Sequence, residues 1–265
     1  MKYSYHSFLI ILFQIVAHLS VVPMILYGSW HHWLVAFLLT FIYGGMGIDM
    51  IKHRYLSHRS FEFNNVWIRR FFLLIASLTM QGPLLFWVII HRQHHTHSDR
   101  DNDPHGPHQG FFGTYVGTTF QSNNKEKALI VKDYFKDKDV IFFSKYHWLI
   151  NILYMSILYL LFGSMGPVAY YLFPGFYAWF VANMVNYLAH QKSLGYRNYE
   201  IKDNSVNIRW LAYFSYGGAL HNNHHADPRN PFFSRKKKES DSTGMFISLL
   251  NKFNLVTVDK KFKRI

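Results

Sequence analysis

The sequence contains no cysteine among its 265 residues. This absence excludes disulfide bonds, cysteine-ligated iron–sulfur clusters and thiolate-ligated haem within the chain. Any zinc or iron must therefore be held by histidine, aspartate or glutamate, and the chain has 17 histidines. Acidic residues are also few, 15 against 28 lysines and arginines, so the formal charge is +13. Such a balance suits nucleic acid, an anionic membrane surface or an anionic substrate, and the positions of the charges decide among them.

Charged residues are almost absent from four long apolar stretches. Each stretch is long enough to cross a hydrocarbon core of about 30 Å as a helix, so we predict membrane spans at about 7–28, 31–51, 146–164 and 167–190. We expect Asp49 and Lys52 to mark the exit of the second span into water. The predicted fold is an all-α integral membrane protein forming a single domain, 1–265, in which residues 52–145 and 191–265 build a cytosolic helical cap.

The basic residues are distributed on one side of these spans. All 28 fall at position 2, between 52 and 145, or between 192 and 264, and none lies in either short turn between spans. Because cytoplasmic segments carry the excess of lysine and arginine, we predict a protein of the inner cell membrane whose N- and C-termini both lie in the cytosol. The positive charge then faces anionic headgroups, and no motif supports binding of nucleic acid.

Nine histidines form a pattern typical of a metal site. We call His53 with His58 the first motif, His91–His95 the second and His221–His225 the third. The second motif places three imidazoles on one face of a helix, and the same spacing returns in the third. Neutral imidazole is the commonest metal ligand near neutral pH. Because nine ligands exceed what one metal with an open position needs, we predict two metals on the cytosolic side. The predicted ligands are His53, His58, His91, His94, His95, His190, His221, His224 and His225.

A shared site constrains the chain between the first two motifs. His58 and His91 must lie on the same side of the membrane, so we predict that the apolar run 66–90 either lies in the interface or dips into the membrane and returns, instead of crossing. His53 and His58 would point about 140° apart on a regular helix. They therefore bind different metals, or the helix ends between them. Spacing alone does not choose iron over zinc.

The other histidines follow a weaker pattern. We predict structural roles for five isolated or interfacial ones: His6, His18, His31, His32 and His147. Three more follow the second motif in a turn-rich loop and are expected around the site or in solvent: His97, His105 and His108. Asn186 lies one helical turn before His190, where it either bonds a neighbouring helix or holds a metal-bound water.

These residues together resemble the acyl-CoA (stearoyl-CoA) desaturase-like family of membrane fatty-acyl desaturases, in its bacterial form. The resemblance runs from about residue 30 to the end of the chain. It rests on five segments: His53–Arg59, Gln81–His95, Ser98–His105, Asn186 with His190, and His221–Pro228.

The resemblance implies four transmembrane helices beneath a cytosolic cap, with the nine histidines holding two iron ions and Asn186 reaching them through a water. It implies that dioxygen and external electrons introduce a cis double bond into a fatty-acyl chain, with acyl-CoA the expected substrate. A separate ferredoxin, rubredoxin or cytochrome would deliver the electrons. Trp87, Gln81 and Ala182 match positions that line a bent acyl tunnel.

The chain departs from the family pattern at two of these places. Gly217-Gly218 stands where Gly-Glu is frequent, which removes a carboxylate close to the third motif. Ala182 stands where a threonine is usual, which leaves the position of the double bond open. Two alternatives remain: a hydroxylase on the same di-iron centre and, in a different class, a metal-transport protein. Transport would need a polar path through spans that are nearly free of charge.

Overall fold

The computed structural model describes residues 5–117 and 129–264, and these are mostly helical. The N-terminal part is a helical hairpin whose arms are α1 (Tyr5–Leu19) with α2 (Val21–Tyr27), and α3 (Trp30–Thr40) with η1 (Phe41–Ser57). The arms form continuous apolar helices of 23 and 28 residues. Both arms are long and apolar enough to cross a bilayer.

A second pair of apolar helices follows later in the chain. It consists of α9 (His147–Phe162) and the continuous helix formed by α10 (Met165–Pro167), η5 (Val168–Leu172) and α11 (Phe173–Leu188). The second of these is long enough to span, whereas α9 has only 16 residues and meets α8 (Lys138–Lys145) at a 62° bend. In the described chain three helices are therefore long and apolar enough to cross a membrane, or four if α8 and α9 form one broken span.

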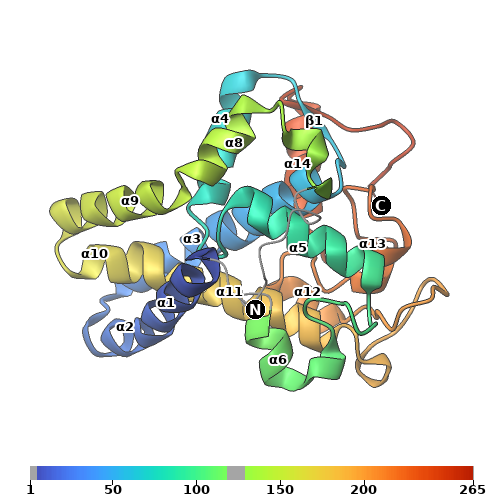
Figure 1. The fold of residues 1–265 in the computed structure, drawn as a ribbon, viewed down its shortest axis with the longest axis horizontal. Helices are drawn as coiled ribbons and strands as arrows, with labels where there is room; N and C mark the ends of the chain where they lie inside the picture. Colours follow the sequence, from blue (N-terminus) through green and yellow to red (C-terminus); the bar gives the residue numbers. More distant parts are fainter. Residues whose placement is uncertain (1–4, 118–128, 265) are drawn as a thin grey trace.

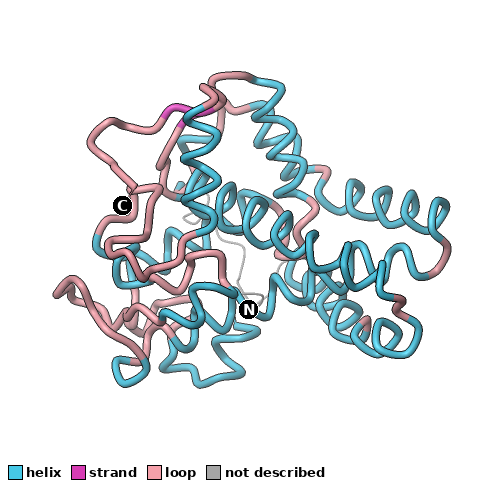
Figure 2. The backbone as a smooth tube through the Cα atoms, turned by 180° about the vertical axis from the view of Figure 1, so that it is seen from behind, coloured by secondary structure: helices cyan, strands magenta, loops and turns pink. Residues whose placement is uncertain are grey.

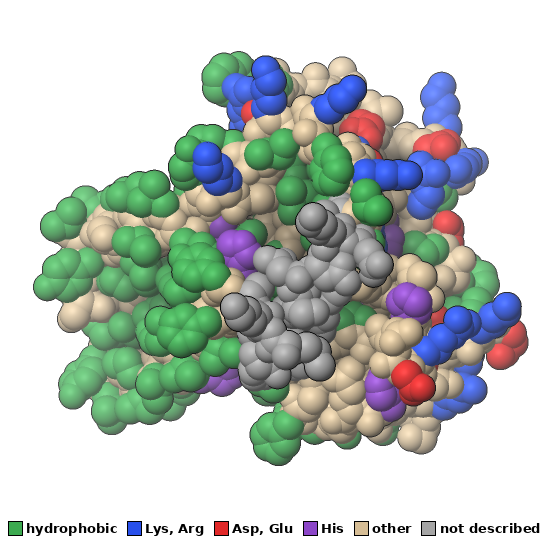
Figure 3. Space-filling view, viewed as in Figure 1, with side chains coloured by type: hydrophobic (Ala, Val, Ile, Leu, Met, Phe, Trp, Pro, Cys, Tyr) green, Lys and Arg blue, Asp and Glu red, His purple; other side chains and the backbone are tan. Residues whose placement is uncertain are grey.

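The surface of the molecule is divided into an apolar part, over these helices, and a polar part. Large apolar side chains are exposed on these helices, among them Tyr27, Phe37 and Leu160 at 71, 72 and 80% exposure. Figures 1 and 3 show the apolar helices gathered at one end of the long axis, while lysines and arginines lie toward the opposite end. An exposed apolar belt of this kind is typical of lipid contact, and the chain has the form of a multi-pass membrane protein.

The run 66–90 does not form one helix. Asn65 caps α4 (Val66–Ser77) by accepting from the amides of Trp67 and Ile68, and α5 (Leu84–His97) begins after a break that contains Gly82. The chain turns back at this break, because His58 and His91 lie side by side with their Nε2 atoms 2.8 Å apart. The chain thus returns to the same site within this run, as a shared site requires, while the depth of the run in a bilayer stays a prediction.

The predicted exit to water at Asp49 and Lys52 is wrong. Both side chains are buried, with 7 and 0% exposure, and η1 continues past them to Ser57. Asp49 is tolerated because Arg54, itself fully buried, donates to its carboxylate at 2.8 Å. The second helix is thus longer than the predicted 31–51, and its last turns lie inside the protein.

The remaining elements are short, and Figure 2 shows that most of the loop-rich chain lies at the end of the molecule away from the long helices. Strands β1 (Glu62–Phe63) and β2 (Val256–Thr257) pair antiparallel. The helices are η2 (Pro107–Gln109), α6 (Gly110–Gly117), η4 (Lys132–Tyr134), η6 (Lys192–Leu194), α12 (Arg209–Phe214), α13 (His221–Ala226) and α14 (Ser242–Lys252). Helices α12 and α14 lie within residues 191–265, the second part of the predicted cap. Part of the predicted cap, 118–128, lies outside the described residues.

Candidate metal centre

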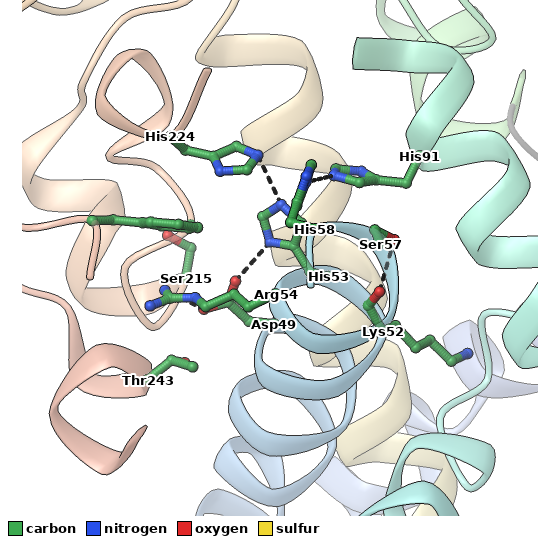
Figure 4. A network of polar contacts seen from close by, with 12 residues as sticks. Asp49, Lys52, His53, Arg54, Ser57, His58, His91, Ser215, His224 and Thr243 are labelled. Atoms are coloured by element: carbon green, nitrogen blue, oxygen red, sulfur yellow. Dashed lines mark hydrogen bonds and ion pairs between the residues drawn. The ribbon is translucent and has the colours of Figure 1, made fainter. Parts of the chain in front are cut away.

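Four segments far apart in the sequence bring nine histidines together. His53 lies in the last turn of η1 and His58 is the residue that caps its C-terminus. Helix α5 carries the second motif, α13 carries the third, and His190 follows two residues after the end of α11. Figure 4 shows the side chains from η1, α5 and α13 pointing toward one another.

The ring nitrogens fall into two adjacent groups. Within each group, one ligand atom from every residue lies within 4.8 Å of the others. The first group contains His53, His58, His91, His95 and His224, and the second contains His94, His190, His221 and His225. All nine predicted ligand residues are therefore in a position to hold metal, divided five and four.

The spacing of the two repeated motifs explains this division. On α5 the pair His91 and His95, one turn apart, points to the first group, while the intervening His94 points to the second. On α13 the roles are exchanged, because His221 and His225 belong to the second group and His224 to the first. Each helix thus contributes to both groups, which places the groups next to each other.

The first motif contributes both of its histidines to the same group. The helix ends between them, which was one of the two possibilities left open by the sequence. In addition, η1 is a π-helix, and the amide of His58 bonds the carbonyl of His53 at 3.2 Å. An i→i+5 bond brings the fifth residue back above the first, so the angle expected from a regular α-helix does not apply.

Five of the nine rings are oriented through their Nδ1 atoms. Four of these atoms lie close to carboxylates and one lies close to a backbone carbonyl, an arrangement that turns Nε2 toward the centre of a group. The pairs are His53 with Asp49 at 2.9 Å, His94 with Asp103 at 3.0 Å, His190 with Asp99 at 3.1 Å, His225 with Asp203 at 2.8 Å, and His221 with the Gly218 carbonyl at 3.2 Å.

The chemistry of this donor set fits a cation. His94 and His225 must carry their protons on Nδ1, because the carboxylates they contact can only accept. Their Nε2 atoms then present lone pairs to each other at 3.3 Å, which is unfavourable unless a positive charge lies between them. Two ligand nitrogens about 2.1 Å from one ion and at a right angle would be about 3.0 Å apart, and Nε2 pairs at 2.8–3.0 Å occur in both groups.

The rings are also in the protonation state that ligation needs. Burial, with a further contribution from neighbouring histidines, lowers the pKa of five of the rings outside the apolar helices well below the usual value: His91, His95, His221, His224 and His225. They are therefore neutral near pH 7, and neutral imidazole is the ligand form.

Two narrow cavities reach the histidines from the side of the apolar helices. Each has a volume of about 70 Å³, and both are lined by Trp87, Ala182 and Asn186. The first also touches His91, and the second touches His221. The three residues predicted next to the site therefore line both cavities.

One wall of the first cavity is fixed by an aromatic stack. The indole of Trp87 lies on the ring of His91, with centroids 4.8 Å apart and planes at 17°. Its Nε1 donates to Oε1 of Gln81 at 2.7 Å. Gln81, Trp87 and the second motif thus form one connected wall that ends at the first group.

Comparison with known proteins identifies this arrangement. Residues 28–239 match the family described as fatty acid desaturase. The chain belongs to the fatty acid desaturase family. An sn-1 stearoyl-lipid 9-desaturase of Anabaena variabilis is 34% identical over 240 residues, 88% of this chain and 87% of that protein. An sn-1 stearoyl-lipid 9-desaturase of Synechocystis sp. is 34% identical over 248 residues, which cover 91% of this chain and 75% of that protein.

A plant relative extends this likeness. Delta-9 acyl-lipid desaturase 1 of Arabidopsis thaliana is 33% identical over 201 residues, which cover 71% of this chain and 62% of that protein. The relatives are named for lipid-linked acyl chains, so the expected acyl-CoA substrate finds no support in them. The broader predictions, an oxidoreductase of lipid metabolism with a histidine cluster able to hold metal, are confirmed.

The desaturase structure also contains site residues that sequence reasoning did not assign. Asp49 was interpreted as a membrane exit, and Asp203 was not considered, yet each orients a histidine. Asp49 lies four residues before His53, a helical spacing that would have indicated the contact. At Gly218, where the resemblance leads one to expect a glutamate, the backbone carbonyl lies 3.2 Å from Nδ1 of His221.

His105 lies closer to the centre than its loop position suggests. It is buried and stacks on His94, with centroids 4.3 Å apart. Burial and the neighbouring His94 lower its pKa to about 3. Among the other histidines of this loop, His97 is partly buried and His108 is exposed.

Proposed function

We propose that this chain is an oxygen-dependent desaturase that introduces a cis double bond at carbon 9 of an acyl chain esterified in a membrane lipid. The observation that carries the proposal is the pair of adjacent histidine groups at the end of cavities that open from the lipid-facing helices. The names of the relatives supply the bond position and the lipid-linked form of the substrate.

The nine histidines are proposed to hold two iron ions, five for one and four for the other. When bound, the irons would supply the activation of dioxygen that removes two hydrogens from adjacent carbons. The balance is one dioxygen, two electrons and two protons, with a double bond and two waters as products. Because the chain has no cysteine for an iron–sulfur cluster, we infer that a separate ferredoxin, rubredoxin or cytochrome delivers the electrons.

The chain's own residues would orient the ligands and the substrate. Asp103 and Asp203 keep the Nδ1 proton on His94 and His225, so that Nε2 stays free to bind metal. Trp87 forms a rigid wall against His91, and the small side chain of Ala182 lines the same cavity. Asn186 lines both cavities and is proposed to hold a water next to the second group.

The proposed setting is a single domain, 1–265, in the inner membrane of a cell, with both termini and a cap formed by 52–145 and 191–265 in the cytosol. The one-sided distribution of lysine and arginine supports this orientation. The broad exposed apolar surface supports a substrate that stays in the bilayer, while the positive charge near the polar end would also suit the phosphates of acyl-CoA.

The test is reconstitution of the iron-loaded protein into vesicles containing a lipid with a stearoyl chain at sn-1. Ferredoxin, its reductase and NADPH supply electrons, and a parallel reaction offers stearoyl-CoA. Mass spectrometry of the products is expected to reveal oleoyl chains in the lipid. Desaturation of the CoA thioester alone would overturn the substrate form, an added oxygen would indicate a hydroxylase, and no product with both irons bound would contradict the proposal.

A further inference from the structure

The break between α4 and α5, which we call the return loop, is Leu78–Pro83, and its backbone is held by side chains from three apolar helices. Gln14 of α1 donates to the carbonyl of Met80 at 2.9 Å, and Asn151 of α9 donates to that of Ser77, just before the loop, at 2.9 Å. Lys52 of η1 donates to the carbonyl of Gly82 at 2.8 Å. Irregular backbone among lipid-facing helices needs such partners, because no water is available there.

The loop is also packed closely by glycines of two helices. A Cβ atom on Gly47 of η1 would lie 2.5 Å from the side chain of Thr79, and one on Gly175 of α11 would lie 2.4 Å from the sulfur of Met80. Both distances are too short for a real Cβ, so a larger residue at either position would displace the loop side chain that it meets. Thr79 and Met80 are buried, with 1 and 2% exposure. The loop therefore has little freedom to move.

Lys52 is the unusual member of this set. Its side chain is fully buried, and the described residues provide no carboxylate within ion-pair distance of it. Figure 4 shows Lys52 pointing away from His53 and the other ligands, toward the opposite side of η1. A buried lysine amine with one carbonyl partner is costly compared with an apolar side chain of the same length. Stability alone does not account for a lysine here.

The loop ends at the wall of the acyl cavity. Gln81 belongs to the loop, accepts from Nε1 of Trp87 at 2.7 Å, and lines the first cavity beside it. Trp87 in turn stacks on His91. A shift of the loop would therefore move the indole, and with it the part of the cavity that decides which carbons lie next to the histidines.

On the basis of the proposed function, we propose that Lys52 and Gln14, with Asn151, are positioning residues that hold the return loop so that Gln81 and Trp87 set the position of the double bond. They act through the loop and do not touch the substrate. Removing one donor frees one carbonyl, loosens the loop, and lets the acyl chain bind in more than one register.

The experiment compares the full chain with Lys52→Met and Gln14→Leu, which remove donors on two different helices. Ser20→Ala is the control, since this buried hydroxyl donates to the carbonyl of Ala17 in its own helix region and not to the loop. Hydrogen–deuterium exchange of the peptide that contains the loop is measured without substrate. Iron content and the double-bond positions of the products are measured on the same preparations.

We expect both variants to bind iron as the original chain does and to exchange the loop amides at least about tenfold faster, equivalent to about 1.4 kcal/mol of local stability. The products should change from one dominant double-bond isomer to a mixture in which an isomer with the bond at a neighbouring carbon makes up roughly a tenth or more. This loss of discrimination between positions is similar in free energy to the tenfold change in exchange. Ser20→Ala should change neither readout. Lys52→Gln, which keeps a donor, should return the mixture toward one isomer.

Unchanged exchange in both variants would show that the donors do not hold the loop. Faster exchange with an unchanged isomer pattern would overturn the role in specificity. Absence of any unsaturated product from the original chain would instead contradict the proposed function, while the exchange measurement would still test how the loop is held.

Discussion

Replacing Asp203 by asparagine should remove one metal and leave the other. Oδ1 of Asp203 accepts from the amide and the hydroxyl of Ser205, at 2.9 and 2.5 Å, and Oδ2 accepts from Nδ1 of His225 at 2.8 Å. In Asp203→Asn the amide oxygen stays with the two donors of Ser205, so the NH₂ group faces His225. That ring must then accept at Nδ1 and carry its proton on Nε2, the atom that points to the second group.

The size of the effect follows from this exchange of tautomers. Loss of an orienting partner typically costs 10- to 100-fold in metal affinity, or about 1.4–2.8 kcal/mol. The substitution keeps the shape of the side chain, so the fold should be preserved. Because His225 belongs to the four-histidine group, the five-histidine group should keep its affinity.

The assay is anaerobic titration of the metal-free protein with ferrous iron in competition with a chelator. The original chain should bind two equivalents of iron. In Asp203→Asn, the iron of the four-histidine group should be removed at a chelator concentration 10- to 100-fold lower than the original chain requires. Asp101→Asn is the control, because Asp101 is exposed in a nearby turn and the change in charge is the same. If Asp203→Asn retains both equivalents with the affinity of the control, the assigned tautomers and the division into two groups are refuted.

Three further predictions address the site and its support. His94→Ala or His224→Ala should abolish desaturation and lower iron content, whereas His31→Ala, exposed and remote from both groups, should do neither; equal activity in all three would contradict the ligand assignment. Arg54→Met should lower the free energy of unfolding by about 3–5 kcal/mol, measured by thermal denaturation in detergent, because two buried carboxylates, each 2.8 Å from the guanidinium, lose their counter-charge; a melting temperature equal to the original would exclude this role. Burial disfavours ionisation of Glu239, but hydrogen bonds from a tyrosine hydroxyl and backbone N–H groups outweigh it and lower its pKa. The depressed pKa stabilises the folded protein above the usual value of 4.5, and this contribution is lost as the pH falls further, so the stability gap between the original chain and Glu239→Gln should narrow upon acidification below that value, and a gap that widens would contradict the reasoning.

Several features of the site could be predicted because they are local. The spacing of the second and third motifs follows from the 3.6-residue period, and α5 and α13 do present their histidines together. The return of the chain between His58 and His91 could be inferred from the need for a shared site. The relative direction of His53 and His58 does not follow from their spacing, because a π-helix changes which residues share a face and no residue type marks it.

The second set of features depends on contacts between distant segments. Asp49 and Lys52 are both charged residues near the end of an apolar run. In the structure, however, Asp49 contacts the ring of His53, whereas Lys52 donates to the carbonyl of Gly82 in the return loop. Whether a charged residue at a helix end meets water or a buried partner is decided by what packs around it. The contact of the Gly218 carbonyl with His221 is equally invisible in a side-chain pattern.

The sequence by itself determined that the helices are apolar, that cysteine cannot hold a metal, and that two histidine motifs share one helical spacing, because composition and helical period are properties of the chain alone. Only the tertiary structure decided which histidines share a group, which carboxylates orient them, and how the return loop is held among the apolar helices. Those choices depend on distances of a few ångströms between segments more than a hundred residues apart, and no local pattern encodes them.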